Sequence, residues 1–120
     1  MLETGYQSKI IKRIKGIFGV AINGKYTETG TADLICGWPK VIYEEVVLIH
    51  LHIEVKTEKD YNRVFKSIYE EDGLYKFKDN ISSLKEHEYL QITKLNEVRK
   101  LGGKALIAWD FSQVKEYMES

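Results

Sequence analysis

The stretch from Ile49 to Lys56 constrains the fold of this chain most, because its side chains alternate strictly between apolar and polar. Four branched apolar residues occupy the odd positions, and two histidines, a glutamate and a lysine occupy the even ones. A period of two is typical of a β-strand with one face against the core. The other face then presents Glu54 and Lys56 side by side, although a solvated strand could carry such a pair without any function.

A second apolar segment, Ala32 to Cys36, precedes this strand and carries Asp33 near its start. The two segments are close in the sequence and are joined by turn residues, so we expect them to be neighbours in one sheet. An aspartate followed by Glu-x-Lys on neighbouring strands combines a metal site with an ammonium group. This combination is suited to metal-assisted hydrolysis of phosphodiesters.

The chemistry of such a site assigns a role to each residue. Asp33, Glu54 and the carbonyl of Val55 are oxygen ligands of the kind that Mg²⁺ prefers. A bound metal polarises a phosphate and lowers the pKa of a coordinated water. Lys56 would orient or deprotonate the attacking water, or neutralise charge in the transition state. Each motif alone is weak, because Glu-x-Lys on a strand often arises by chance.

The remaining segments are predicted from their periodicity and turn residues to form an α/β sandwich around a mixed sheet. In the first half of the chain we expect a helix over 2–18, a short strand over 19–24, a loop over 26–30, a turn over 37–40, and strands over 41–56 with a break or hairpin tip at 44–45. In the second half we expect a helix over 57–72, a loop over 73–83, a helix from Ser82 or Ser83 to Leu101, a strand over 104–109 and a helix over 111–119. Glu86 is the expected capping-box partner of Ser83. Gly102 and Gly103 are expected to end that helix.

Composition sets broad bounds on the chain. Its 120 residues predict one domain, and a formal net charge of zero gives no general field that would attract nucleic acid. Basic residues gather in the first quarter, where a solvated helix face is a commoner explanation than a phosphate-binding patch. Cys36 is the only cysteine, so no disulfide framework is expected. No apolar run is long enough to cross a membrane.

The apolar stripe of the first helix continues backwards from Ile10 into Gln7 and Glu3. A carboxylate on a stripe that faces the sheet is costly unless another group pairs with it. The alternative is that Glu3 faces solvent in the first turn and interacts favourably with the helix dipole. The residues alone leave both interpretations open.

Four places along nearly the whole chain form a wider pattern. They are Gly30-Thr31-Ala32-Asp33-Leu34-Ile35, Ile53-Glu54-Val55-Lys56, Gln91, and Gly102-Gly103-Lys104-Ala105. Together they resemble the VRR-Nuc domain of the PD-(D/E)xK nuclease superfamily, most closely its small stand-alone, often phage-borne members. The spacing of eleven residues from Gln91 to the glycine pair, and the early helix with Glu3 and Gln7, are also similar to that family.

The resemblance implies a restriction-endonuclease-like α/β sandwich with a central mixed β-sheet flanked by helices, in a single domain over residues 1–120. It implies DNA cleavage with Mg²⁺, for which Mn²⁺ would substitute. Asp33 and Glu54 would match the metal-binding acids, Lys56 the catalytic lysine, Gln91 a helix glutamine near the site, and Glu3 an acid of the first helix. Two departures are an insertion at about 58–83 and a long distance from Asp33 to Glu54. The latter suggests an extended hairpin, and either departure could reshape the substrate groove or make a dimer contact.

We therefore expect a metal-dependent endonuclease that prefers branched DNA, acts as a homodimer on a two-fold junction, and works in the cytoplasm, including that of a phage-infected bacterium. The alternatives are a related Holliday junction resolvase and a non-catalytic DNA-binding or assembly module.

Other residues allow further interpretations. His50 and His52 could be a zinc pair, His87 could reach the site or DNA, and Tyr61, Tyr69, Tyr75 and Phe77 could stack on unpaired bases, although packing is the commoner role for each.

Overall fold

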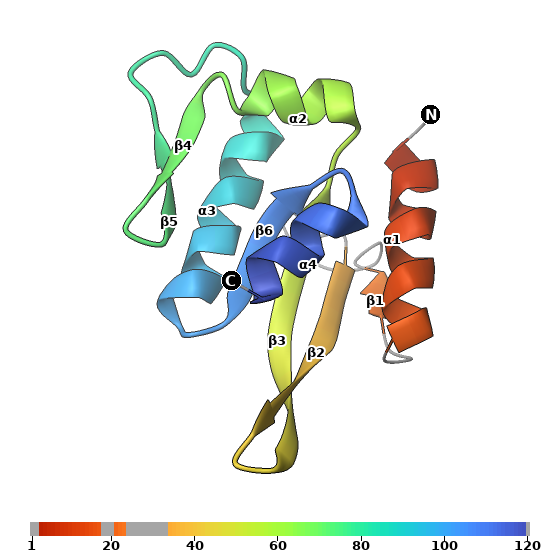
Figure 1. Cartoon of the computed structure of the whole chain (residues 1–120). Coiled ribbons are helices and arrows are strands. Elements are labelled where there is room, and N and C mark those ends of the chain that lie inside the picture. Colours follow the sequence, from red (N-terminus) through yellow and green to blue (C-terminus); the bar gives the residue numbers. More distant parts are fainter. Residues whose placement is uncertain (1–2, 18–20, 24–33, 120) are drawn as a thin grey trace.

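The computed structural model describes residues 3–17, 21–23 and 34–119 of the chain (Figure 1). Its elements are α1 (Glu3–Ile17), β1 (Ala21–Asn23), β2 (Leu34–Ile42), β3 (Glu45–Val55), α2 (Glu58–Val64), β4 (Ile68–Glu71), β5 (Leu74–Phe77), α3 (Glu86–Lys100), β6 (Lys104–Ala108) and α4 (Phe111–Glu119). The predicted first helix, short strand, last strand and closing helix are confirmed within the described residues. The expected loop over 26–30 lies outside them.

The main sheet has the strand order β1-β2-β3-β6 and is mixed, as the sequence predicted. β2 pairs antiparallel with both β1 and β3, whereas β6 pairs parallel with β3. The segments 32–36 and 49–56 are expected from the sequence to be neighbours in one sheet. This pairing is confirmed for their described residues, since Leu34 lies opposite Ile53. β4 and β5 form a separate antiparallel pair.

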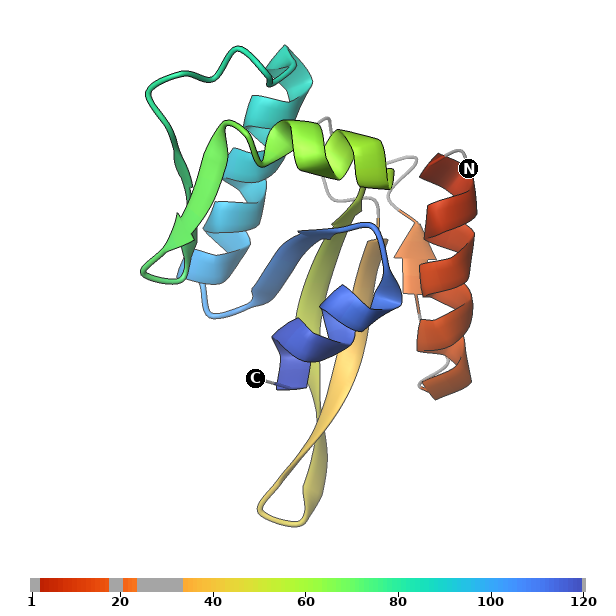
Figure 2. The same cartoon turned by 45° about the horizontal axis from the view of Figure 1, so that its top comes forward.

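Different helices cover the two faces of the main sheet, so β3 lies in the middle of a sandwich (Figures 1 and 2). Side chains of β6 alternate between the two cores, as the pleat of a strand requires. The core beneath α1 and α4 contains Ile10, Leu34, Cys36, Trp38, Leu51, Ile53, Val55, Leu106, Ala108, Phe111, Val114 and Met118. The core beneath α2 and α3 contains Val64, Ile68, Tyr75, Ile92, Leu95, Ala105 and Ile107.

The predicted turn over residues 37–40 is wrong, because β2 continues through it and stays paired with β3 as far as Ile42. The reversal occurs at Tyr43 and Glu44, whose φ angles of 50° and 66° are those of a tight two-residue hairpin turn. Pro39 is tolerated inside the strand because, among the described residues, β1 pairs with β2 only at residues 34–36 and no strand lies beside that edge of β2 beyond them. The expected hairpin tip near Glu44 and Glu45 is confirmed.

The predicted helix over 57–72 is wrong in its second half, because α2 ends at Val64 and a β-hairpin follows. An Asp72-Gly73 turn with φ angles of 54° and 75° joins β4 to β5, and β5 lies inside the segment expected to be a loop. Tertiary contacts hold this hairpin in place. Asn96 of α3 bonds both backbone groups of Tyr75, and the Tyr75 hydroxyl accepts the N–H of Ile107 on the open edge of β6.

Helix α3 begins three or four residues later than predicted. Its N-cap is Lys85, and the carboxylate that accepts the Lys85 N–H belongs to Glu88 rather than to the expected Glu86. Gly102, with φ of 90°, ends the helix as predicted. Within the described residues, no helix combines the length and apolar character that crossing a bilayer requires.

Candidate active site at the end of strand β3

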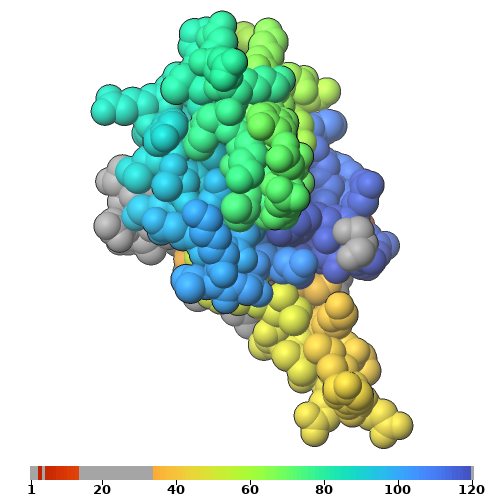
Figure 3. All heavy atoms as spheres, turned by 90° about the vertical axis from the view of Figure 1, so that its left-hand side faces the viewer, coloured from red at the N-terminus to blue at the C-terminus, as the bar shows by residue number. Residues whose placement is uncertain are grey.

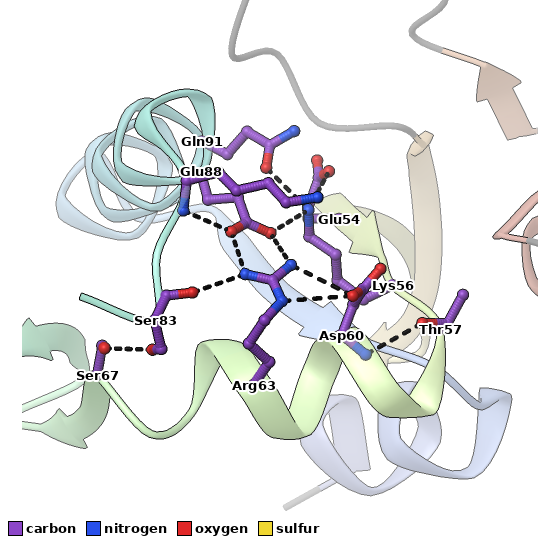
Figure 4. Close-up of polar contacts among 10 residues, drawn as sticks. Glu54, Lys56, Thr57, Asp60, Arg63, Ser67, Ser83, Glu88 and Gln91 are labelled. Atoms are coloured by element: carbon purple, nitrogen blue, oxygen red, sulfur yellow. Dashed lines mark hydrogen bonds and ion pairs between the residues drawn. The ribbon is translucent and has the colours of Figure 1, made fainter. Parts of the chain in front are cut away.

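Glu54 and Lys56 lie at the end of β3, on the face of the sheet that α2 and α3 cover (Figure 4). They are buried, with 2% and 5% of their surface exposed. The alternative of a solvated strand face is therefore excluded here, because two helices close over it. Two ionisable side chains in a protein interior require partners, and both have them.

The ammonium of Lys56 lies between three side chains. Its Nζ is 3.1 Å from Oε1 of Gln91, 3.1 Å from Oε2 of Glu88 and 3.9 Å from Oε1 of Glu54. Gln91 is 35 residues away in the sequence. The fold thus brings together three of the predicted site residues, Glu54, Lys56 and Gln91.

Glu88 is the residue that the sequence interpretation missed. Its carboxylate receives two bonds from the guanidinium of Arg63, at 2.7 and 2.9 Å, one from the backbone N–H of Lys85 and one from Lys56. A signal for it was available, since Glu88 lies one helical turn before Gln91 on the stripe that continues to Leu95. An acid on such a stripe needs a cation, and α2 supplies Arg63.

The bonds to Glu88 determine its charge. Burial alone would raise the pKa of this carboxyl group, but the bonds from Arg63, the Lys85 backbone and Lys56 outweigh burial and hold the pKa at about 2. In return, the carboxylate of Glu88 raises the pKa of Arg63. Glu88 is therefore ionised near neutral pH, and its carboxylate fixes the position of the Lys56 ammonium.

The low pKa predicts a loss of stability in acid. Because the pKa of Glu88 falls from its usual 4.5 to about 2 on folding, its contribution is fully present above about pH 4.5 and disappears as the pH falls towards 2. A shift of this size means that ionised Glu88 contributes on the order of 3 kcal/mol to the free energy of unfolding. Urea denaturation between pH 6 and pH 2 should show the advantage of the natural protein over Glu88→Gln shrinking by that amount. A constant difference across this range would contradict the assignment.

Of the other predicted ligands, Val55 and Glu3 lie within the described residues and Asp33 does not. Asp33 comes directly before β2 in the sequence. Val55 is the buried last residue of β3, and Glu3 is half-buried in the first turn of α1, which packs on the other face of the sheet. Glu54 and the Val55 carbonyl are hard oxygen donors, so the chemistry of the donor set fits Mg²⁺. No group of three His, Cys, Asp or Glu residues suited to a metal occurs within the described ranges.

The two histidines of β3 contact each other. Their Nε2 atoms are within hydrogen-bonding distance, and burial together with the neighbouring His50 lowers the pKa of His52. Within the described part of the chain, no third ligand completes a metal-binding group with them. Of the aromatic residues, Tyr75 is buried and hydrogen-bonded, which removes it from base stacking, whereas Tyr69 is exposed.

Comparisons with protein-family models, curated proteins and solved structures found no significant match. The resemblance to the VRR-Nuc domain therefore stays a prediction. The cluster itself indicates the function: a buried carboxylate and an ammonium lie at the end of a central strand, and an amide and a second carboxylate from α3 hold the ammonium.

Proposed function

We propose that this chain is a divalent-metal-dependent DNA endonuclease with a restriction-endonuclease-like fold, of the VRR-Nuc type, that hydrolyses phosphodiester bonds in branched DNA. The observation that carries the proposal is the position of the Lys56 ammonium, 3.9 Å from Glu54 and 3.1 Å from Gln91 at the end of β3. The fold part is supported by a mixed sheet in which β3 lies between antiparallel β2 and parallel β6, with helices over both faces.

The proposed roles follow from chemistry. Glu54 would hold Mg²⁺ or Mn²⁺ together with Asp33, the Val55 carbonyl and Glu3, and the ion would supply Lewis acidity towards the phosphate. Lys56 offers a compact positive charge, which stabilises anionic oxygen as it develops. Gln91 and Glu88 each accept one bond from the Lys56 Nζ, so the ammonium is held in a fixed place before substrate arrives.

A second candidate is a non-catalytic DNA-binding or assembly module that keeps this cluster for stability. The observation in its favour is that Lys56 is 5% exposed and already bonded to Glu88 and Gln91, as a purely structural lysine would be. The two candidates differ in one property, which is cleavage that depends on a metal ion.

Cleavage of a small DNA panel tests the proposal. The panel contains linear duplex, single strand, a flap, a splayed arm and a four-way junction, each with Mg²⁺, Mn²⁺ or EDTA. We expect cutting of a branched substrate with either metal and none with EDTA, because the phosphate is activated by the bound ion. Binding of all substrates without cutting would instead establish the non-catalytic module.

Asp33→Asn is the sharpest variant for the metal-binding role. It removes one negative charge without changing the size of the side chain, so we expect cleavage to fall by roughly 100-fold or more while DNA binding persists. Asp79→Asn, an exposed acid between β5 and α3, is the matched control. Cleavage by Asp33→Asn at the unmodified rate would exclude Asp33 from the site.

A further inference from the structure

The hairpin formed by β2 and β3 projects from the body of the protein. β1 pairs only with residues 34–36 and β6 only with residues 51–55, so residues 37–50 have no other strand beside them in the described structure. We call residues 39–48 the arm, because Trp38 and Ile49 at its base pack in the core beneath α1 and α4. Figures 1 and 3 show it extending beyond the helices, and it contributes to a longest dimension of 46 Å for the molecule.

One face of the arm is apolar and exposed. Val41 and Val46 lie opposite each other and are 70% exposed, Leu48 is 65% exposed, and Tyr43 at the tip is 96% exposed. An isolated two-stranded hairpin is only marginally stable in water, and contiguous exposed apolar surface marks an interaction site. An arm of this composition therefore needs a partner.

The same face leads to a surface pocket at the base of the arm. Alternation along β3 puts His50 on the face of Leu48 and Val46, and His50 lines a pocket of about 340 Å³ with Val98, Leu101, Gly102 and Gly103. Leu101 is 89% exposed. An exposed lysine, Lys100, directly precedes Leu101 in the sequence.

The two ends of this face are complementary in chemistry. The tip carries an exposed aromatic ring and two exposed acids, Tyr43, Glu44 and Glu45, whereas the pocket is apolar and its residue Leu101 directly follows the exposed Lys100 in the sequence. About 17 Å separate Glu45 from His50 along the strand, at roughly 3.3 Å per residue. A two-fold axis through the middle of the arm exchanges its ends, so it would bring each tip to the pocket of the other copy.

We propose that the partner is a second copy of this chain, with the two arms packed antiparallel and Tyr43 of each copy inserted in the pocket beside Leu101 of the other. The interface is isologous, so both tip-to-pocket contacts form together. The acidic tip disfavours DNA as the occupant, because Glu44 and Glu45 would repel phosphate. This proposal does not depend on nuclease activity.

Sedimentation equilibrium of the natural protein and of Val46→Glu/Leu48→Glu tests the arm. We expect a dimer at micromolar concentration and a dissociation constant raised about 30-fold or more in the variant, since charges replace the centre of the interface. Tyr89→Glu, an exposed aromatic on α3 away from the arm, is the control and should leave the dimer unchanged. Circular dichroism of each variant checks folding, which exposed positions should preserve.

Charge reversal tests the register of the two copies. Glu44→Lys and Lys100→Glu should each weaken the dimer by about 10-fold, and the two changes in one chain should restore it. Under oxidation, Tyr43→Cys/Leu101→Cys should form disulfide-linked dimers, and Cys36 would not interfere because burial raises the pKa of its thiol to about 11. A monomer at 100 μM or below, an association that Val46→Glu/Leu48→Glu leaves intact, or arm-dependent binding to lipid vesicles by a monomer would overturn the proposal.

Discussion

Lys56→Ala is expected to reduce metal-dependent cleavage by about 100- to 1,000-fold, with binding of the DNA substrate retained. The ammonium is the positive charge nearest Glu54 in the described cluster, and preorganised charges of this kind contribute most in the transition state. Single-turnover cleavage of the preferred branched substrate, measured beside a binding titration, separates the loss of rate from a loss of affinity.

Lys59→Ala is the matched control for Lys56→Ala. Lys59 is an exposed lysine of α2, so its loss changes the net charge equally while leaving the cluster intact. Lys56→Arg adds a second comparison, because a planar guanidinium cannot replace a compact ammonium bonded to both Glu88 and Gln91. If folded Lys56→Ala cleaved within about threefold of the natural protein, the catalytic assignment of Lys56 would be wrong and the cluster would be structural.

Arg63→Met is expected to lower the free energy of unfolding by about 3 kcal/mol. The variant leaves the 1%-exposed carboxylate of Glu88 without its two guanidinium bonds at 2.7 and 2.9 Å, and a buried ion pair broken on one side costs this much. For a chain of this size the melting temperature should fall by about 10 °C. Urea and thermal denaturation at pH 7 measure both quantities.

Arg63 also offers an internal control. It makes a partly exposed ion pair with Asp60 at 3.3 Å, where the two side chains are 27% and 35% exposed, so Asp60→Ala should cost less than about 1 kcal/mol. Arg63→Met/Glu88→Met should cost less than the sum of the two single variants, because both charges disappear together. Additive costs would mean that Arg63 and Glu88 do not stabilise each other.

Local patterns predicted much of the fold correctly. The alternation from Ile49 to Lys56 indicated β3, Gly102 and Gly103 indicated the end of α3, and the apolar run before Trp109 indicated buried β6. Each of these features depends on residues near one another in the chain, so side-chain periodicity and the positions of glycines predict it directly. The Glu54, Lys56 and Gln91 cluster was also predicted, through resemblance together with an apolar helix stripe.

The errors occurred where long-range contacts override local preference. Gly37 to Lys40 is turn-like in composition, yet β2 continues because β3 supplies a full set of partners as far as Ile42. Residues after Val64 are helical in pattern, yet a hairpin forms because Tyr75 and Asn96 anchor it to β6 and α3.

The sequence by itself determined the strands of the main sheet, most helix limits, the mixed character of that sheet and the residues at the end of β3, because side-chain period and turn chemistry are local properties. Only the tertiary structure decided that the Glu54 face is closed by α2 and α3, and that Glu88 is the carboxylate bonded to both Lys56 and Arg63. It also decided that the arm stands apart from the body. Burial and charge pairing depend on which elements meet in space, and the helical stripe of Glu88 indicates only that it faces inward.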